Sequence, residues 1–508
     1  MALPKDHLLF DVRRGVSARP LREQHLPLAQ WMDPDVVANA KTLAYDPQNP
    51  GGQILVGAVG ERLIGIDDNR HVMTVAGSRT GKSVQIVGNL LHYPGSALVI
   101  DPKGELASLT AVRRAALGQR VVVLDPFKRA RRGAEAFRAS YNPLSVLDET
   151  SETLVEDAGI IADAIVAAAP NAKDPHWDDS ALHFIEGLIL HVATSPLHQG
   201  RRTLNTVSRL VTLATKTEED GEGNGYFEVE DAMLTNAERL MKSDATYAAG
   251  LALESAARDF YEKADTERAS VLSTVRRHTH FLSYRAIQNV LTVNRLDLAD
   301  LKRDPRGVTI YLCLPALQMA RCHRWLRIIV SQLLDAMERE PATPKAPVLV
   351  CLDEFPVLGH MKQLENAAGQ IASFGVRLWV VLQDWGQGKA LYKDRWESFA
   401  ANAGIMQFFG NADLTTTKYI SELLGKTAVR TEKQGEITPE DRKAGKDGIS
   451  LSLELYDLLT AAEVATLFSR DDRLKRQLVI WAGYNPMILQ RVEYFDPDGP
   501  LARATSRS

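Results

Sequence analysis

Residues 72–83 read VMTVAGSRTGKS, and this stretch decides the fold. The apolar run at residues 72–75 is typical of a strand, and a loop of small residues follows it. The loop ends in Gly81-Lys82-Ser83, after which valines and leucines recur at helical spacing over residues 84–91. A strand, a glycine-containing loop and a helix in this order predict a phosphate-binding loop.

The chemistry of this loop predicts a site for ATP and Mg²⁺. Backbone N–H groups of the loop and of the following helix N-terminus favour an anion. We expect Lys82 to contact the terminal phosphates and the Ser83 hydroxyl to ligate Mg²⁺. The residues expected to bind the nucleotide are Gly77, Ser78, Arg79, Thr80, Gly81, Lys82, Ser83 and, from a later strand, Asp353.

One position departs from the pattern G-x-x-x-x-G-K-[ST]. Ala76 stands where the first glycine is expected, and alanine is the mildest replacement. The neighbouring Gly77 supplies flexibility at this point. The alternative, an ordinary glycine turn before a helix, is disfavoured because strand, loop and helix all agree with the motif.

Composition places the chain among ordinary globular proteins. With 508 residues it is too long for one core, so we expect two or three domains. Hydrophobic residues make up 45% and charged residues 24%, and the net charge of -4 does not exclude a local basic channel for nucleic acid. The cysteines, Cys313, Cys322 and Cys351, lack metal-ligand spacing and indicate a reducing compartment.

The sequence offers no secretory signal and no apolar run long enough to cross a membrane. We therefore expect a soluble, cytoplasmic chain.

Alternation of strands and helices predicts an α/β fold with a parallel sheet. Apolar runs end at Ile100, Leu124, Leu314, Leu352 and Leu382, and helical patterns separate them. From about residue 150 to 300 the strands vanish and helical spacing takes over, which predicts an inserted all-α domain. The expected division is an N-terminal arm at 1–50, a nucleotide-binding domain at 51–148 and 301–495, an all-α domain at 149–300 and a C-terminal tail at 496–508.

Several finer assignments follow from local pattern. Gln53–Gly57 and Arg62–Ile66 predict a hairpin, and a long helix is expected at Cys322–Glu338. A further helix is expected at Met361–Phe374. The charged, glycine-dotted segments Thr217–Gly225 and Lys426–Gly448 are expected to be loops.

Carboxylates and an amide stand at the ends of two later strands. Asp353 and Glu354 follow the apolar run at 348–352, and Gln383 follows the run at 377–382. Parallel strands bring such residues to one edge of a sheet. Asp353 is expected to hold the Mg²⁺ water shell and Glu354 to polarise the attacking water. Gln383 is expected to hydrogen-bond the γ-phosphate or that water, and a change of this contact when the phosphate leaves would act as a switch. Alone, Asp353-Glu354 reads equally well as a solvated strand end; the phosphate-binding loop favours the catalytic interpretation.

Hydrolysis of this type usually needs a cation against the γ-phosphate, and a neighbouring subunit often supplies an arginine. The candidates are Arg70, Arg377 and the pair Arg276-Arg277. Each of them, taken alone, is more typical of a structural or surface arginine.

Taken together, these segments resemble the coupling ATPases of type IV secretion and conjugation systems (TraG/TraD type), relatives of the FtsK/HerA DNA pumps. The resemblance spans roughly residues 50 to 495. The segments that carry it are RHVMTVAGSRTGKSV (70–84), PGSALVIDPKGE (94–105), VVVLDPF (121–127), YNPL (141–144), DPHWDDSA (174–181), TIYLCLP (309–315), LDEFPVLG (352–359), FGVRLWVVLQD (374–384) and GYNPMILQRVEYF (483–495).

The resemblance implies a RecA-like P-loop domain with an inserted all-α domain, assembled as a hexameric ring. It implies partners as well: DNA, a relaxase–DNA or protein effector substrate, a secretion channel and the other type IV secretion ATPases. It gives Lys82, Ser83, Asp353, Glu354 and Gln383 the roles stated above, and it places Arg70 next to the nucleotide of a neighbouring copy.

Two features depart from the family. Most members begin with transmembrane helices, so this chain is expected to reach the inner membrane peripherally, through a membrane-docking partner, or to be truncated. The family's second arginine, upstream of Gln383, has no unambiguous counterpart: Ala372 and Ser373 stand near that place, and Arg377 is close but is expected to point with its strand.

Three functions remain open from the sequence. The first is an ATP-driven coupling protein that recruits and translocates DNA or protein. The second is a soluble FtsK/HerA-like DNA motor outside secretion. The third is an ATP-binding substrate-docking platform, which predicts nucleotide binding with negligible turnover.

Overall fold

The structure is a computed structural model that describes residues 29–166, 176–219, 225–292, 296–434 and 449–506. Most of the expected N-terminal arm, residues 1–28, lies outside these ranges. The rest of the arm carries α1 (Pro34–Asn39) and the 3-10 helix Lys41–Leu43. The Asp33 side chain accepts the Asp35 N–H and Pro34 opens α1, which explains why a helix begins here.

One large mixed sheet organises the described residues. Its eleven strands lie in the order β2-β1-β15-β14-β11-β3-β10-β9-β4-β8-β5. The strands are β1 (Ile54–Val59), β2 (Arg62–Ile66), β3 (His71–Ala76), β4 (Ala97–Asp101), β5 (Arg120–Leu124), β8 (Val308–Cys313), β9 (Val348–Leu352), β10 (Val376–Leu382), β11 (Ala403–Phe409), β14 (Arg476–Trp481) and β15 (Met487–Gln490). From β11 to β5 the neighbours run parallel, whereas β14, β15, β1 and β2 continue the sheet as antiparallel strands.

Burial explains why the central strands are continuous apolar runs. Every residue of β3, β4, β8, β9 and β10 is buried. A parallel strand covered on both faces cannot alternate polar and apolar residues, which is why the sequence predicted it as an uninterrupted run. The predicted parallel sheet and the predicted hairpin β1–β2 are confirmed.

Helices accompany the sheet along the chain. They are α2 (Lys82–Leu90), α3 (Glu105–Ala116), α12 (Ala316–Arg339), α13 (Lys362–Ala367), α14 (Trp385–Tyr392), α15 (Arg395–Ala401), α16 (Leu414–Leu424), α18 (Ala461–Leu467) and α19 (Pro500–Ser506). The last of these occupies most of the expected C-terminal tail.

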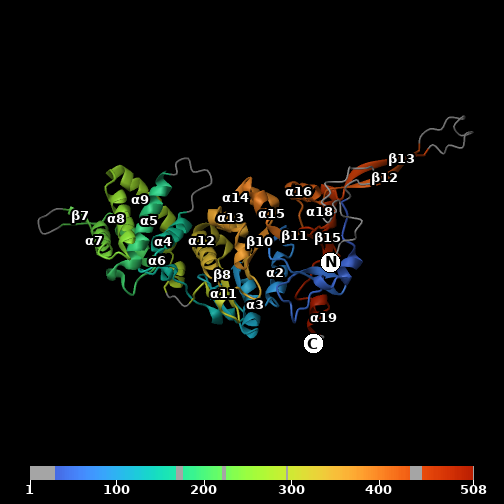
Figure 1. The fold of residues 1–508 in the computed structure, drawn as a ribbon, viewed down its shortest axis with the longest axis horizontal. Helices are drawn as coiled ribbons and strands as arrows, with labels where there is room; N and C mark the ends of the chain where they lie inside the picture. The colour runs from blue at the N-terminus through green and yellow to red at the C-terminus, as the bar shows by residue number, and fades with distance from the viewer. Residues whose placement is uncertain (1–28, 167–175, 220–224, 293–295, 435–448, 507–508) are drawn as a thin grey trace, which may run out of the picture.

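The chain between β5 and β8 is mainly helical, as predicted. Its α-helices are α4 (Leu154–Ile165), α5 (His176–Thr194), α6 (Leu204–Leu213), α7 (Glu228–Leu240), α8 (Tyr247–Tyr261), α9 (Asp265–Thr279), α10 (Arg285–Val290) and α11 (Asp300–Arg303). Figure 1 shows most of these helices gathered at one end of the molecule, beside the sheet region. They have buried aromatic packing of their own, for example Phe184 of α5 stacked on Phe260 of α8 at 3.7 Å between ring centroids. Since β5 and β8 pair directly, the helical region is an insertion between two neighbouring strands.

The prediction of a loop at Lys426–Gly448 is wrong for its first nine residues. Lys426–Gln434 forms β12, which pairs with β13 (Ile449–Asp457) as an antiparallel ribbon that extends away from the body (Figure 1). The sequence of β12 shows no apolar run because a two-stranded ribbon need not bury either face against the core. Residues 435–448 lie outside the described ranges.

Three further assignments need correction. The loop expected at Thr217–Gly225 contains two short paired strands, β6 (Thr217–Glu219) and β7 (Gly225–Phe227). The helix expected at Met361–Phe374 ends at Ala367, close to Gly369, and resumes as the 3-10 helix Ile371–Phe374. Helix α12 begins six residues before the expected Cys322, since Pro315 supplies a natural start.

Candidate nucleotide-binding site

The loop between β3 and α2 has the backbone geometry of a tight anion cradle. Gly81 has a φ of +98° and Arg79 a φ of +59°, so the chain twice enters the left-handed region. A Cβ on Gly77 would come within 2.1 Å of the Gly410 carbonyl oxygen, so only glycine fits there. Ala76, the departure from the motif, is the last residue of β3 and pairs with Phe409, a position that alanine fills without strain.

Six consecutive backbone donors of the loop are available. Within the described residues, the N–H groups of residues 78–83 make no hydrogen bond, whereas Gly77 N–H donates to Phe409 and Val84 N–H to Gly81. The donors lead into the N-terminus of α2, where the helix dipole also favours negative charge. The arrangement suits a polyphosphate.

The predicted partners of the loop meet it at the same edge of the sheet. Strand β10 pairs with both β3 and β9, so the carboxyl ends of the three strands lie side by side. Ser83 Oγ lies 3.5 Å from Asp353 Oδ2, and Gln383 Nε2 donates to Glu354 Oε1 at 2.9 Å. A hydroxyl beside a carboxylate is a donor set that Mg²⁺ prefers.

Burial and neighbouring charges shift the pKa values of the ionisable groups at this sheet edge. Burial lowers the pKa of Lys82, while the nearby Glu354 and Asp353 oppose that shift. Burial raises the pKa of Asp353 to about 6, against the attraction of Lys82, and Glu354 adds to the rise. The buried carboxyl of Asp101, next to it on β4, has a pKa raised to about 7 by burial and by Asp353. Burial is the main cause of the raised pKa in both carboxyl groups, so a cation held beside Asp353 would favour its ionised form.

Glu354 stands in a strained backbone conformation. Its φ of +67° and ψ of +50° lie in the left-handed region, which is uncommon for a residue other than glycine, asparagine or aspartate. Such strain costs on the order of 1–3 kcal/mol and gathers at functional sites. Directly after Glu354 the chain forms the 3-10 helix Phe355–Leu358.

Replacing Asp353 with asparagine is expected to stabilise the nucleotide-free, Mg²⁺-free protein at pH 8. A carboxyl whose folded-state pKa exceeds its ordinary value of 3.8 costs stability wherever it is ionised in both states. The cost is complete above about pH 6 and disappears as the pH falls toward 4. Because the side chain keeps some contact with water, we expect a gain of about 1–2 kcal/mol in the free energy of unfolding.

Urea unfolding at pH 8 and at pH 4 measures this gain, with Asp471→Asn as a control on a fully exposed carboxylate. A stability equal to that of the wild type at pH 8 would refute the raised pKa.

The candidate arginines lie away from the phosphate-binding loop of their own chain. Arg70 precedes β3 at the end opposite to the loop, and it forms a two-pronged contact with Asp68 at 2.6 and 2.9 Å. Its side chain is 42% exposed, so a neighbouring copy can reach it. Arg377 is buried and donates to the Gly52 carbonyl at 2.7 Å, which removes it as a candidate. Arg277, next to the exposed Arg276, pairs with Asp178 within the helical region.

The structure adds two cations that the sequence did not single out. Lys103, exposed after β4, lies close enough to affect the pKa of both Lys82 and Asp353. Arg491 donates to the Thr80 carbonyl at 2.6 Å and lies over the Phe409 ring, so it braces the loop from the C-terminal segment. The position of Lys103 at the carboxyl end of a strand was a usable signal; nothing local marked Arg491.

Nearly all of the chain matches one family of proteins. Residues 30–507 match the family model described as type IV secretory system conjugative DNA transfer. The chain belongs to this family. The conjugal transfer protein TraG of Escherichia coli is 28% identical over 396 residues, which covers 73% of this chain and 57% of that protein. The type IV secretion system-coupling protein VirD4 of Bartonella quintana is 24% identical over 447 residues, covering 85% and 64%.

Solved structures of a coupling protein share the fold. The conjugative coupling protein TrwBdeltaN70, in its unbound monoclinic form, superposes with a TM-score of 0.63 at 13% identity, covering 92% of this chain and 94% of that one. TrwB in complex with ADP and Mg²⁺ gives a TM-score of 0.60 at 14% identity, covering 94% and 98%. The RecA-like fold with an all-α region, expected from the sequence, is thereby confirmed.

The chain spans about three fifths of the length of the curated relatives named above. None of the helices in the described part of the chain combines the length and the hydropathy of a membrane-spanning helix.

Proposed function

We propose that this chain hydrolyses ATP with Mg²⁺ and uses the energy to move DNA. The observation that carries the proposal is the meeting of two sets of groups at one sheet edge. One set is the loop at residues 78–83 with its unused N–H donors, and the other is the trio Asp353, Glu354 and Gln383.

Each residue has a distinct task in this proposal. The loop amides and Lys82 bind the phosphates, and Ser83 with Asp353 holds Mg²⁺, which when bound neutralises charge on the phosphates. Glu354 accepts a hydrogen bond from the attacking water and aligns it with the γ-phosphorus. Gln383 now donates to Glu354, and it can exchange that contact for a γ-phosphate oxygen, which gives the site two states.

The relatives support the rest of the function. We propose that the chain is the motor part of a type IV secretion coupling protein, which receives DNA or a relaxase–DNA or protein substrate and passes it to the secretion channel. Residues 51–148 and 301–495 serve as the nucleotide-binding domain and residues 149–300 as the all-α domain. We also propose a ring of six copies in which the exposed Arg70 of one copy lies against the nucleotide of the next.

Turnover of ATP by the purified chain tests the enzymatic part. We expect phosphate release that requires Mg²⁺ and stops when EDTA is added. Binding of ATP without phosphate release, at all Mg²⁺ concentrations and with DNA present, would favour the docking platform.

The affinity for DNA is expected to fall steeply with salt. The chain is acidic overall, so binding must come from local lysines and arginines that displace counterions from phosphates. Two phosphate contacts already predict a fall of about tenfold in the association constant between roughly 50 and 200 mM NaCl. Fluorescence anisotropy of a labelled duplex measures it. An association constant that does not change over this range would exclude electrostatic contact with the backbone.

A further inference from the structure

Arg327 of α12 hydrogen-bonds to two separate parts of the molecule, the segment after Glu354 and the end of α4. Its side chain is buried, and the residue keeps 8% of its surface exposed. Nη1 donates to the Leu358 carbonyl at 2.9 Å and to the His360 carbonyl at 2.7 Å. Nε donates to the Ala164 carbonyl, at the end of α4, at 3.2 Å. One guanidinium thus bonds both the segment after Glu354 and the helical region.

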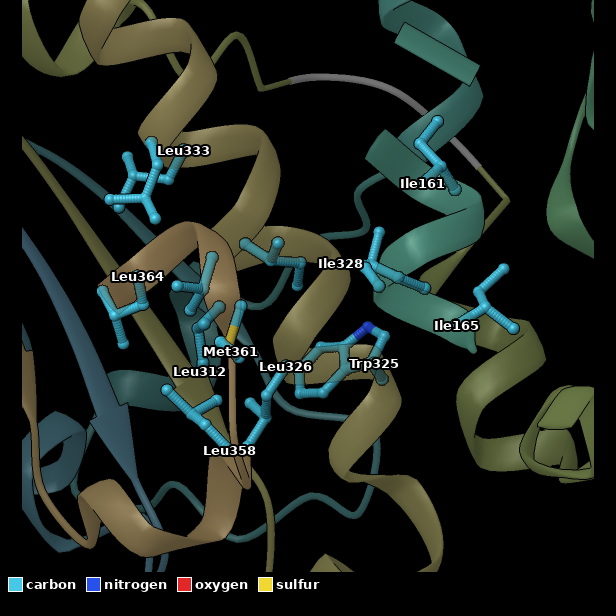
Figure 2. Close-up of a cluster of buried hydrophobic side chains, with 14 of the residues drawn as sticks. Ile161, Ile165, Leu312, Trp325, Leu326, Ile328, Leu333, Leu358, Met361 and Leu364 are labelled. Carbon is cyan, nitrogen blue, oxygen red and sulfur yellow. The ribbon is translucent and has the colours of Figure 1, made fainter. Parts of the chain in front are cut away.

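The surroundings make these contacts necessary. Figure 2 shows the middle of α12 between two apolar groups, with Leu358, Met361 and Leu364 on one side and Ile161 and Ile165 of α4 on the other. A guanidinium buried among such side chains must find acceptors, and here the three carbonyls supply them. Burial lowers the pKa of Arg327 to about 10, with Asp163 and Tyr392 favouring the charge and Arg324 opposing it, so the group is protonated at neutral pH.

The first two acceptors determine where Glu354 stands. Glu354 is the N-cap of the 3-10 helix Phe355–Leu358, and Val357 N–H donates to the Glu354 carbonyl at 2.9 Å. Arg327 bonds the far end of this helix on both sides of Gly359, whose φ is +65°. The left-handed conformation of Glu354 costs energy, so it persists only if the segment on each side is fixed. Strand β9 fixes one side, and Arg327 fixes the other.

The third acceptor extends the connection to the helical region. The last carbonyls of a helix lack partners within it, and a cation near them is favoured by the helix dipole. Arg327 bonds Ala164 and Arg324, three residues earlier on α12, bonds Ile165 at 2.9 Å. Arg324 Nη2 also lies 3.1 Å from His278 Nδ1 of α9, but within the described residues Arg324 has no hydrogen bond to the segment after Glu354.

We propose that Arg327 is a positioning residue for hydrolysis: it fixes the Glu354 carboxylate and ties it to the helical region. The inference rests on the proposed role of Glu354 in ATP hydrolysis. The role requires an arginine, because the planar guanidinium donates to the two segments from separate nitrogens, Nη1 and Nε. A lysine side chain ends in a single nitrogen.

Arg327→Lys tests the proposal, with Arg324→Lys as the matched control. Both variants weaken the contact with α4, but only Arg327→Lys releases the segment after Glu354. We expect kcat for ATP to fall about tenfold or more in Arg327→Lys, with the dissociation constant for ATP within about twofold of the wild type. In Arg324→Lys we expect kcat to stay within about twofold. Amide hydrogen exchange over residues 355–361 is expected to quicken in Arg327→Lys alone.

The outcomes separate the inference from the function on which it rests. No ATP turnover by the wild type, with or without DNA, would reject the proposed function itself. Turnover by the wild type together with an unchanged kcat in Arg327→Lys would reject the positioning role alone. Equal losses of kcat in the two variants would show a merely structural contribution and reject it as well. If the lysine variant fails to fold, Arg327→Gln, whose amide can bond only one of the two segments, takes its place in the same measurements.

Discussion

The Lys82→Ala variant is expected to lose ATP turnover by at least a factor of about 100 while keeping its fold. Lys82 is the cation of the segment 78–83, whose six N–H donors are unused, and it lies within electrostatic reach of Glu354 and Asp353. Its ammonium is disfavoured by burial in the free protein, so removing it costs little stability. Removing it does leave the terminal phosphates without their point charge, and the loss is greatest where charge shifts during the reaction.

Lys345→Ala, which removes an exposed lysine before β9, is the control for Lys82→Ala. Phosphate release and thermal unfolding are measured for both variants. Wild-type turnover by Lys82→Ala would contradict the assignment of the loop. Loss of the folded state would show that the lysine has a structural task that we do not expect.

Glu354→Gln is expected to bind ATP about as well as the wild type and to hydrolyse it at least about 100-fold more slowly. The change preserves size, and the carbonyl oxygen of the new amide can still accept from Gln383 Nε2, now 2.9 Å from Oε1. What disappears is the negative charge that polarises water. The loop amides, Lys82 and Ser83 remain in place, so the nucleotide stays bound and uncleaved.

Recovery of intact ATP from the protein after incubation with Mg²⁺ measures this stalled state. Glu397→Gln, on an exposed carboxylate of α15, is the control. Normal hydrolysis by Glu354→Gln would move the water-polarising role to another carboxylate, with Asp353 the first to examine. A loss of binding would mean that Glu354 instead maintains the shape of the site.

Much of the fold was predictable because burial leaves a strong pattern. The runs that became β4 and β9 are apolar throughout, since both faces of a parallel strand are covered. The ribbon β12–β13 was missed for the opposite reason. Its strands lie apart from the core, so Lys426–Gln434 carries charges where a core strand carries valines. The early end of α13, at Ala367, lies two residues before Gly369, and a pattern averaged over many positions hides such a local break.

The residues of the site also differ in whether the sequence could predict them. Lys82, Ser83, Asp353, Glu354 and Gln383 were predictable because parallel strands end on one edge, which turns distant positions in the sequence into neighbours. Arg491 and Arg327 were not predictable, because both hydrogen-bond to backbone carbonyls. Every residue has a backbone carbonyl, so the residue types in the sequence do not reveal such partners. The same limit applies to Arg377, whose burial against Gly52 only the folded chain shows.

The most direct test of the account measures ATP turnover with and without duplex DNA while the oligomer is sized by sedimentation in the same buffer. We predict that DNA raises turnover several-fold and that the rise accompanies a ring-sized species. We also predict that the rise is lost in Arg70→Ala, although that variant still binds ATP. Turnover that is insensitive to DNA and is carried by a monomer would contradict the account, because a single chain would then complete the site alone.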